Sequence, residues 1–167
     1  MLSVVQFSEW PAAIEELLAE SEQEGFRFVR RAREEWLAGA NRFAKEGEAF
    51  FGVFDRTRLV AIGGVNRESG HCGRLRRFYV RRDGRRRGIG RRLVRYALAF
   101  ARRHYSCVVL RCDTEAADRF YRALGFRRTN AHPGATHRID LKRAPNHPPG
   151  TSPGRRAFGT TPPSARP

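Results

Sequence analysis

Apolar side chains recur along residues 2–142 with two different periods, which divide this stretch into helices and strands. A return every three or four positions, as from Trp10 to Leu18, predicts helices over about 10–22, 28–40, 90–104 and 116–124. Short apolar or alternating runs predict strands over about 4–7, 49–54, 59–65, 75–80, 108–112, 126–129 and 136–142. The predicted order is β-α-α-β-β-β-α-β-α-β-β, which is typical of a mixed α/β domain built in layers.

The composition changes after residue 142. Residues 143–167 are rich in proline, glycine, serine and arginine and poor in apolar side chains, so we predict a disordered tail behind one domain over 1–142. No apolar run approaches the roughly 20 residues of a membrane helix. The start, Met1 to Trp10, lacks the features of a signal peptide, and we therefore expect a cytoplasmic protein without a membrane partner.

The cysteines and histidines predict no metal site. The three cysteines, Cys72, Cys107 and Cys112, are odd in number and lack CxxC spacing, which argues against a disulfide framework and against zinc. We expect Cys107 and Cys112 to be small buried apolar residues. The five histidines show no ligand spacing such as HExxH, so no metal is expected.

Charge is unevenly distributed along the chain, whose formal net charge is +16. Residues 1–55 carry 11 acidic and 6 basic side chains, whereas residues 56–142 carry 6 acidic and 23 basic ones. All basic residues except Lys45 and Lys142 are arginine, a bias that a high-GC genome also produces. The asymmetry predicts that one half faces an anion while the other tolerates a cation.

The segment from Val80 to Arg95 has the features of a phosphate-binding loop. A strand ends, a loop with three glycines follows, and a helix begins whose free N–H groups and dipole attract an anion. Gly88 and Gly90 allow the backbone to approach a phosphate closely, and eight arginines lie within 81–95. The loop lacks the Gly-Lys pair of a Walker A motif and the third glycine of a dinucleotide fingerprint.

Two motifs in order resemble the GNAT acetyltransferase superfamily. Arg85-Arg86-Arg87-Gly88-Ile89-Gly90 matches the acyl-CoA loop pattern [Q/R]-x-x-G-x-[G/A], and Ala117 to Phe126 resembles A-x-x-[LF]-Y-x-x-x-G-F. The hairpin at 49–65 lies where the family has its central pair of strands. The resemblance covers about residues 2–142 and implies a mixed, mostly antiparallel sheet flanked by helices. It also implies N-acetyltransferase activity with acetyl-CoA as donor and a primary amine as acceptor.

The resemblance assigns a role to each matching residue. Backbone amides of the loop hold the CoA pyrophosphate, the end of the preceding strand pairs with pantetheine, and a nearby N–H can bind the oxyanion. Tyr121 matches the general acid that protonates the CoA thiolate, and Thr114 stands where many members have asparagine. The implied cofactor-binding set is Phe78, Tyr79, Val80, Arg85, Arg86, Arg87, Gly88, Ile89, Gly90, Arg91, Thr114 and Tyr121.

The acceptor side is less defined. The strand glutamate that some members use as a base is missing from Gly73 to Arg77, so Glu68, His71, Glu35 or a water chain is left for this role. In the family, the acceptor enters over the N-terminal helices and the 66–73 loop. Acidic residues there suggest a cationic amine, namely Glu15, Glu16, Glu20, Glu34 and Glu35. The acceptor, a small-molecule or peptide amine, stays unidentified, and we expect a monomer or homodimer.

Other functions fit part of the same sequence. A non-catalytic acyl-CoA sensor would share the fold, and a different acyl-CoA would fit the same loop. The basic middle of the chain also suggests a nucleic-acid-binding protein. It lacks a recognised reading motif, so we expect no specific nucleic-acid partner.

Overall fold

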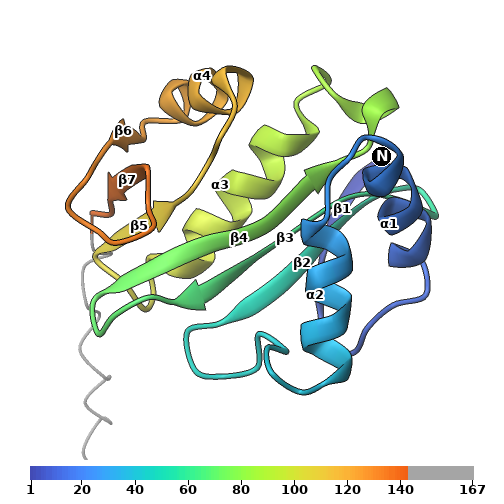
Figure 1. Ribbon diagram of the computed structural model, residues 1–167, viewed down its shortest axis with the longest axis horizontal. Helices are drawn as coiled ribbons and strands as arrows, with labels where there is room; N and C mark the ends of the chain where they lie inside the picture. The colour runs from blue at the N-terminus through green and yellow to red at the C-terminus, as the bar shows by residue number, and fades with distance from the viewer. Residues whose placement is uncertain (143–167) are drawn as a thin grey trace, which may run out of the picture.

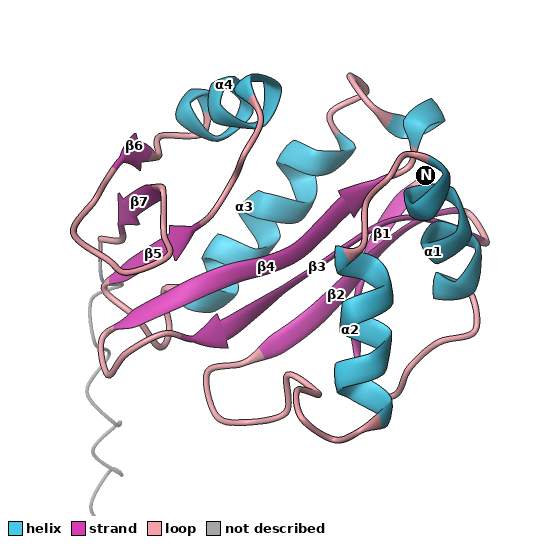
Figure 2. Cartoon of the chain, in the orientation of Figure 1, coloured by secondary structure: helices cyan, strands magenta, loops and turns pink. Residues whose placement is uncertain are grey.

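A seven-stranded mixed sheet forms the centre of the structure, a computed structural model that describes residues 1–142 (Figure 2). The strand order is β1-β2-β3-β4-β5-β7-β6, and β4 and β5 are the one parallel pair among the neighbours in this sheet. The strands are β1 (Leu2–Phe7), β2 (Ala49–Asp55), β3 (Arg58–Arg67), β4 (Cys72–Val80), β5 (Cys107–Leu110), β6 (Arg127–Arg128) and β7 (His137–Asp140). The tail predicted for 143–167 lies outside the described residues.

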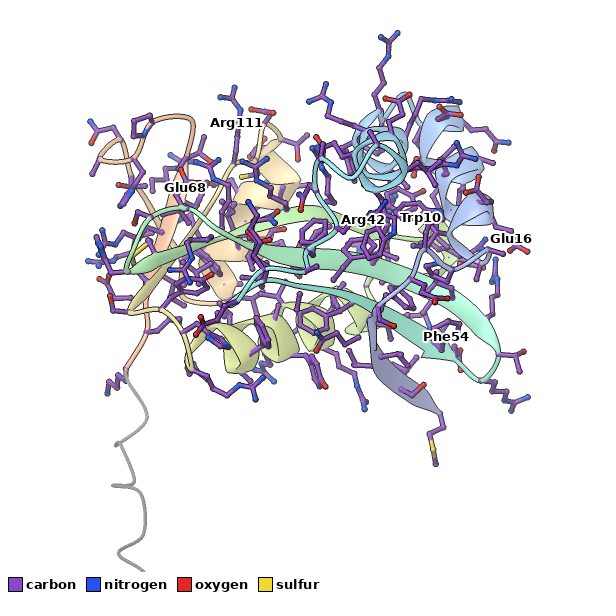
Figure 3. All side chains as sticks on the ribbon, turned by 90° about the horizontal axis from the view of Figure 1, so that it is seen from below. Trp10, Glu16, Arg42, Phe54, Glu68 and Arg111 are labelled. Carbon is purple, nitrogen blue, oxygen red and sulfur yellow. A yellow bond between two sulfur atoms is a disulfide. The ribbon has the colours of Figure 1, made fainter. Side chains whose placement is uncertain are left out.

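Helices cover both faces of this sheet (Figure 1). They are α1 (Ile14–Gln23), α2 (Phe28–Leu37), α3 (Ile89–Ala101) and α4 (Glu115–Ala123), and a short 3₁₀ turn, η1 (Arg82–Gly84), follows β4. Figure 3 views the sheet nearly edge-on, with α1 and α2 on one side and α3 on the other. The predicted order of helices and strands is confirmed, and η1 is one further element that the sequence analysis did not predict. Within 1–142, no helix is long and apolar enough to cross a bilayer.

The sheet separates two apolar cores, because alternate residues of a strand face opposite sides. Phe51 of β2 is fully buried in the core under α3, together with Leu93 and Val94. Its neighbour Phe50 is fully buried on the other side, where it packs with Trp36 of α2. Both faces of β2 are covered, which explains why its sequence is a nearly continuous apolar run instead of an alternating one.

The parallel pairing of β4 with β5 is short. It joins residues 72–74 to residues 107–109, after which β4 continues to Val80 without a partner on that side. We call this separation of the two strands beyond residues 74 and 109 the split. A disulfide links Cys72 and Cys107 at the start of this ladder, where the two Cα atoms are 4.7 Å apart. The expectation that the cysteines form no disulfide is therefore wrong, because strand pairing aligns residues 35 positions apart, which no local spacing reveals. Cys107 is buried as expected, and Cys112 is free and partly buried.

A β-bulge interrupts the other edge of β4. Ile62 of β3 pairs with Tyr79 and Gly64 pairs with Arg76, so Gly63 faces both Arg77 and Phe78. Arg77 has a φ of 62°, in the left-handed region that few non-glycine residues adopt. Such a bulge leaves an extra residue outside the ladder and redirects the strand. Gly63 makes room for it, because an added Cβ would lie 2.7 Å from three ring atoms of Phe78.

We predict that Gly63→Ala destabilises the protein by about 1–3 kcal/mol, because the Phe78 ring must move to admit the new methyl group. Gly70→Ala is the matched control, since a Cβ there meets nothing within 4 Å. Urea unfolding of both variants measures the difference. Equal free energies of unfolding for the two variants would show that the ring is not held against Gly63.

Candidate active site at the split between β4 and β5

The loop between β4 and α3 turns sharply to present its backbone. Arg86 has a φ of 61°, and Gly88, which caps α3, has a φ of 79°. At Gly88 the left-handed conformation carries no penalty from a Cβ, which explains why glycine stands there. No side chain within 1–142 caps the first turn of α3. The helix therefore begins with its N–H groups open to an incoming acceptor.

Six consecutive backbone amides of this loop, those of residues 86–91, have no hydrogen-bond acceptor within residues 1–142. The bonds on either side are made: the Arg85 amide donates to Arg82 and the Arg92 amide donates to Gly88. An array of free N–H groups at the positive end of a 13-residue helix is the physical requirement for binding a phosphate or pyrophosphate. These six amides belong to the residues that the sequence motif assigned to pyrophosphate.

Arg85, in contrast, is already occupied by a carboxylate. Its two terminal nitrogens lie 2.7 and 2.6 Å from the carboxylate oxygens of Glu24, and its Nε donates to the carbonyl of Val80 at 3.0 Å. The Tyr79 hydroxyl donates to the same Glu24 at 2.6 Å. Arg85 therefore fixes the loop to α1, whereas Arg86 and Arg91 have no carboxylate partner among the described residues.

The remaining acids of α1 make similar contacts. Arg81 lies 2.6 Å from Glu16 and 3.5 Å from Glu20, and Glu20 also accepts the backbone N–H of Arg82 at 2.8 Å. Two other acids of the expected acidic surface are likewise paired with arginine, Glu15 with Arg33 and Glu35 with Arg77. The hypothesis of an acidic acceptor surface is therefore not supported, because arginines neutralise four of its five carboxylates.

The end of β4 lies against the loop and both flanking helices. Val80 is 3.3 Å from the position a Cβ would take on Gly90, and the Phe120 ring of α4 lies at the same distance. Phe78 and Val80 point into the α3 side of the sheet, whereas Tyr79 is buried on the α1 side. Phe78, Tyr79 and Val80 thus offer the predicted site their backbone and, for two of them, an apolar wall.

Tyr121 packs against the same apolar core as Phe78 and Val80. The centroids of the Tyr121 and Phe126 rings are 5.5 Å apart. Burial raises the pKa of the Tyr121 hydroxyl above the ordinary value of 10.0, so it stays protonated at neutral pH. No hydrogen-bond partner for this hydroxyl exists within 1–142. Thr114 caps α4 by accepting the Ala117 amide at 3.2 Å, which leaves its hydroxyl hydrogen available to a ligand.

A polar cluster that the sequence did not reveal fixes α4 in place. Asp118 accepts two hydrogen bonds from Arg128, both at 2.8 Å, and one from Nε2 of His137 at 2.8 Å. Arg128 and then His137 hold the pKa of Asp118 well below its usual range. With Nε2 donating, Nδ1 of His137 accepts from Thr136 at 2.8 Å and faces the Cys112 sulfur at 3.5 Å. In the sequence, the one sign of this cluster is the polar Asp118, one turn before Tyr121. Its partners could not be identified from the sequence, because they come from β6 and β7.

The described residues contain no group of three or more histidine, cysteine or acidic side chains arranged to hold a metal ion. The arrangement combines a loop with six free backbone amides, an open strand edge and a protonated phenol. These features suit the binding of a phosphorylated, extended cofactor and the protonation of a leaving group.

We predict that Glu24→Gln lowers the free energy of unfolding by about 1 kcal/mol at pH 7, because it removes a charged partner from Arg85 and Tyr79. Arg85 lowers the pKa of Glu24 from 4.5, so this stabilisation is present above that value and is lost as pH falls below it. Urea unfolding at several pH values measures the effect. Glu22→Gln, which breaks an exposed pair with Arg30, is the control and should change stability less; a pH-independent deficit in Glu24→Gln would contradict the assignment.

Comparison with known proteins agrees with this geometry. The sequence profile of the acetyltransferase (GNAT) family matches residues 10–126. A protein of Exiguobacterium sp. 255-15 that is assigned as an acetyltransferase is 31% identical, with 84% of this chain and 93% of its own covered and a TM-score of 0.73. No curated protein gives a significant match.

More distant solved structures share the fold. A GNAT acetyltransferase from Staphylococcus aureus Mu50 is 15% identical, with a TM-score of 0.67 and coverage of 85% of this chain and 100% of its own. The ribosomal-protein-S18-alanine N-acetyltransferase from Escherichia coli is 18% identical, with a TM-score of 0.59 and coverage of 83% of this chain and 90% of its own. With the profile covering most of the chain and a relative at 31% identity, this protein belongs to the GNAT acetyltransferase family and is an acyl-CoA-dependent acyltransferase.

Proposed function

We propose that the protein transfers the acetyl group of acetyl-CoA to a primary amine by direct attack. The observation that carries the proposal is the row of six unpartnered amides, residues 86–91, at the start of α3. In this proposal they bind the pyrophosphate of CoA, with the guanidinium groups of Arg86, Arg87 and Arg91 adding positive charge around it. The free N–H donors of the loop match the phosphate oxygens of the ligand that the family uses.

The pantetheine arm then follows the open edge of β4. Because β5 pairs with β4 only through residues 72–74, the backbone of Phe78 and Tyr79 has no strand partner on that side within residues 1–142, and the Val80 carbonyl accepts only from the Arg85 side chain. An extended amide chain can pair with such an edge as a strand does. Thr114 stands on the opposite side of the split and can donate its hydroxyl hydrogen to a pantetheine carbonyl.

The reacting carbonyl would then lie near the bulge at Arg77 and Phe78. Attack of the amine on the thioester carbon forms a C–N bond and places negative charge on the carbonyl oxygen, which a backbone N–H of the bulged strand can stabilise. Collapse of this intermediate breaks the C–S bond. Tyr121, whose hydroxyl burial keeps protonated, gives its proton to the departing sulfur.

Removal of the proton from the amine is best assigned to water. Glu68 holds Arg74 through two hydrogen bonds, at 2.7 and 2.8 Å, and Arg74 lowers the pKa of Glu68, which makes it a weak base. Glu35 is paired with Arg77 at 2.8 Å. His71 is exposed just before β4, at the end remote from the bulge. Glu68 and Glu35 are thus paired with arginines and His71 lies far from the bulge, so we assign the role to a water chain.

We predict that acetyl-CoA raises the thermal unfolding temperature and that the protein releases free CoA with a suitable amine. A ligand at 100 times its Kd stabilises the folded state by about 2.7 kcal/mol, which differential scanning fluorimetry detects. Stabilisation without CoA release across an amine library would indicate an acyl-CoA sensor. Comparing acetyl-, propionyl- and succinyl-CoA in the same assay identifies the donor, and no stabilisation by any of them would refute the proposal.

We predict that Tyr121→Phe lowers kcat about 10-fold or more at neutral pH, because the thiolate then leaves without a proton donor. Tyr96→Phe is the matched control, since it removes a hydroxyl from an exposed tyrosine of α3. Both variants are compared in CoA-release assays over a range of pH, with a single-turnover measurement to establish that chemistry limits the rate. An unchanged kcat in Tyr121→Phe over the whole range would exclude the role.

A further inference from the structure

Arg76 lies on the acceptor side of the proposed site. Along β4, Leu75 faces the core under α3 and Tyr79 faces the core under α1 and α2. Because side chains alternate along a strand, Arg74 and Arg76 project from the face opposite to Leu75, on the side of α1 and α2. On this face, Arg74 binds Glu68 and the carbonyls of Pro133 and Gly134. The cofactor loop and α3 lie on the other side of the sheet.

Arg76 also lies just beyond the end of the paired part of β4. The last paired residue of the β4–β5 ladder is Arg74, opposite Val109. Arg76 pairs with Gly64 of β3 immediately before the bulge at Arg77. If the thioester lies at this split, as the proposed function requires, the Arg76 side chain borders the space from which an amine approaches it.

The charges around Arg76 do not balance. Arg74 and Arg77 have side chains that are only 10% exposed, and each has a carboxylate partner, Glu68 and Glu35 respectively. Arg76 is accessible to solvent and has no carboxylate partner within residues 1–142. Three guanidinium groups and two carboxylates thus leave one uncompensated positive charge on this face.

The electrostatic environment of Arg76 also favours a bound anion. Partial desolvation lowers the pKa of Arg76, and the charges of Arg74 and Arg77 lower it further. Both effects disfavour an isolated cation at this position, and the charge of a bound anion offsets them. Nε of Arg77 and Oε2 of Glu35 are both buried without a hydrogen-bond partner within 1–142, so this ion pair adds neither a net donor nor a net acceptor to the face.

We propose that Arg76 is the anion-recognition residue of the acceptor site and that the acceptor is a primary amine carrying a carboxylate close to the amino group. A guanidinium binds a carboxylate through two parallel hydrogen bonds, which fixes the orientation of the acceptor as well as its charge. The amine is then directed at the split between β4 and β5. This inference rests on the proposed function and adds the chemical class of the acceptor, which the acids of α1 and α2 do not define.

The test compares each amino acid with its own carboxamide, which keeps the amine and removes the anion. We expect the wild-type protein to favour the carboxylate form by about 10- to 100-fold in kcat/KM, the usual worth of a hydrogen bond to a charged group. The amine of a carboxamide is less protonated at neutral pH, so intrinsic reactivity works against this result. Polyamines are included as cationic acceptors, and CoA release is the readout.

Variants of Arg76 connect the preference to this side chain. Arg76→Gln should reduce the preference to near one, by raising KM for the carboxylate form while leaving the carboxamide form almost unchanged. Arg76→Lys, which keeps the charge but loses the bidentate geometry, should restore part of it. Arg102→Gln is the control, because it makes the same charge change at the exposed C-terminal end of α3 and should leave the ratio unaltered.

Several outcomes would overturn the proposal. A wild-type protein that acetylates carboxamides or polyamines as well as amino carboxylates contradicts it while leaving acetyl transfer intact. An equal loss of preference in Arg76→Gln and Arg102→Gln shows a general charge effect and contradicts it too. If acetyl-CoA neither stabilises the wild-type protein nor yields CoA, the proposed function itself is wrong. Should Arg76→Gln not fold, the wild-type carboxylate-to-carboxamide ratio decides the matter alone.

Discussion

The three-residue ladder between the parallel strands β4 and β5 is the constraint on which the rest of the site depends. Cys72 and Cys107 join its beginning, and the bulge opposite Gly63 turns β4 away just beyond its end. Between these points the backbone of β4 loses its partner while both faces of the sheet stay covered by helices. An unpaired strand edge inside a domain is costly unless something pairs with it. In the proposed function, the pantetheine of the cofactor is that partner.

The second organising feature is the pairing of the acidic and basic halves of the chain with each other. Glu16 and Glu20 of α1 and its C-cap residue Glu24 are spaced four residues apart and so lie on one side of the helix. There they meet Arg81, the Arg82 amide and Arg85. These contacts hold the loop from the α1 side while leaving its six amides free on the α3 side. Arginine thus has two tasks in this protein, since some guanidinium groups position the loop and others are left for ligands.

This division explains why the loop could be predicted from the sequence, whereas the charges on the acceptor side could not. The free backbone amides of the loop are encoded locally, by glycines and a helix start within a few residues. The acceptor side depends on which charges remain after folding, and that depends on partners more than 40 positions apart, as with Arg77 and Glu35. Counting the acids in residues 1–55 therefore suggested a cationic acceptor, whereas four of the five acids are paired with arginine and Arg76 of β4 has no carboxylate partner within 1–142.

The sequence by itself determined the order of helices and strands, the loop from Arg85 to Gly90 and the place of Tyr121, because periodicity, glycine positions and short motifs act over a few residues. Only the tertiary structure decided the disulfide between Cys72 and Cys107, the bulge at Arg77, the cluster of Asp118 with His137 and Arg128, and the partners of each arginine. Strand register and ion pairing join residues that are distant in the chain. Their energies depend on geometry that no local pattern contains.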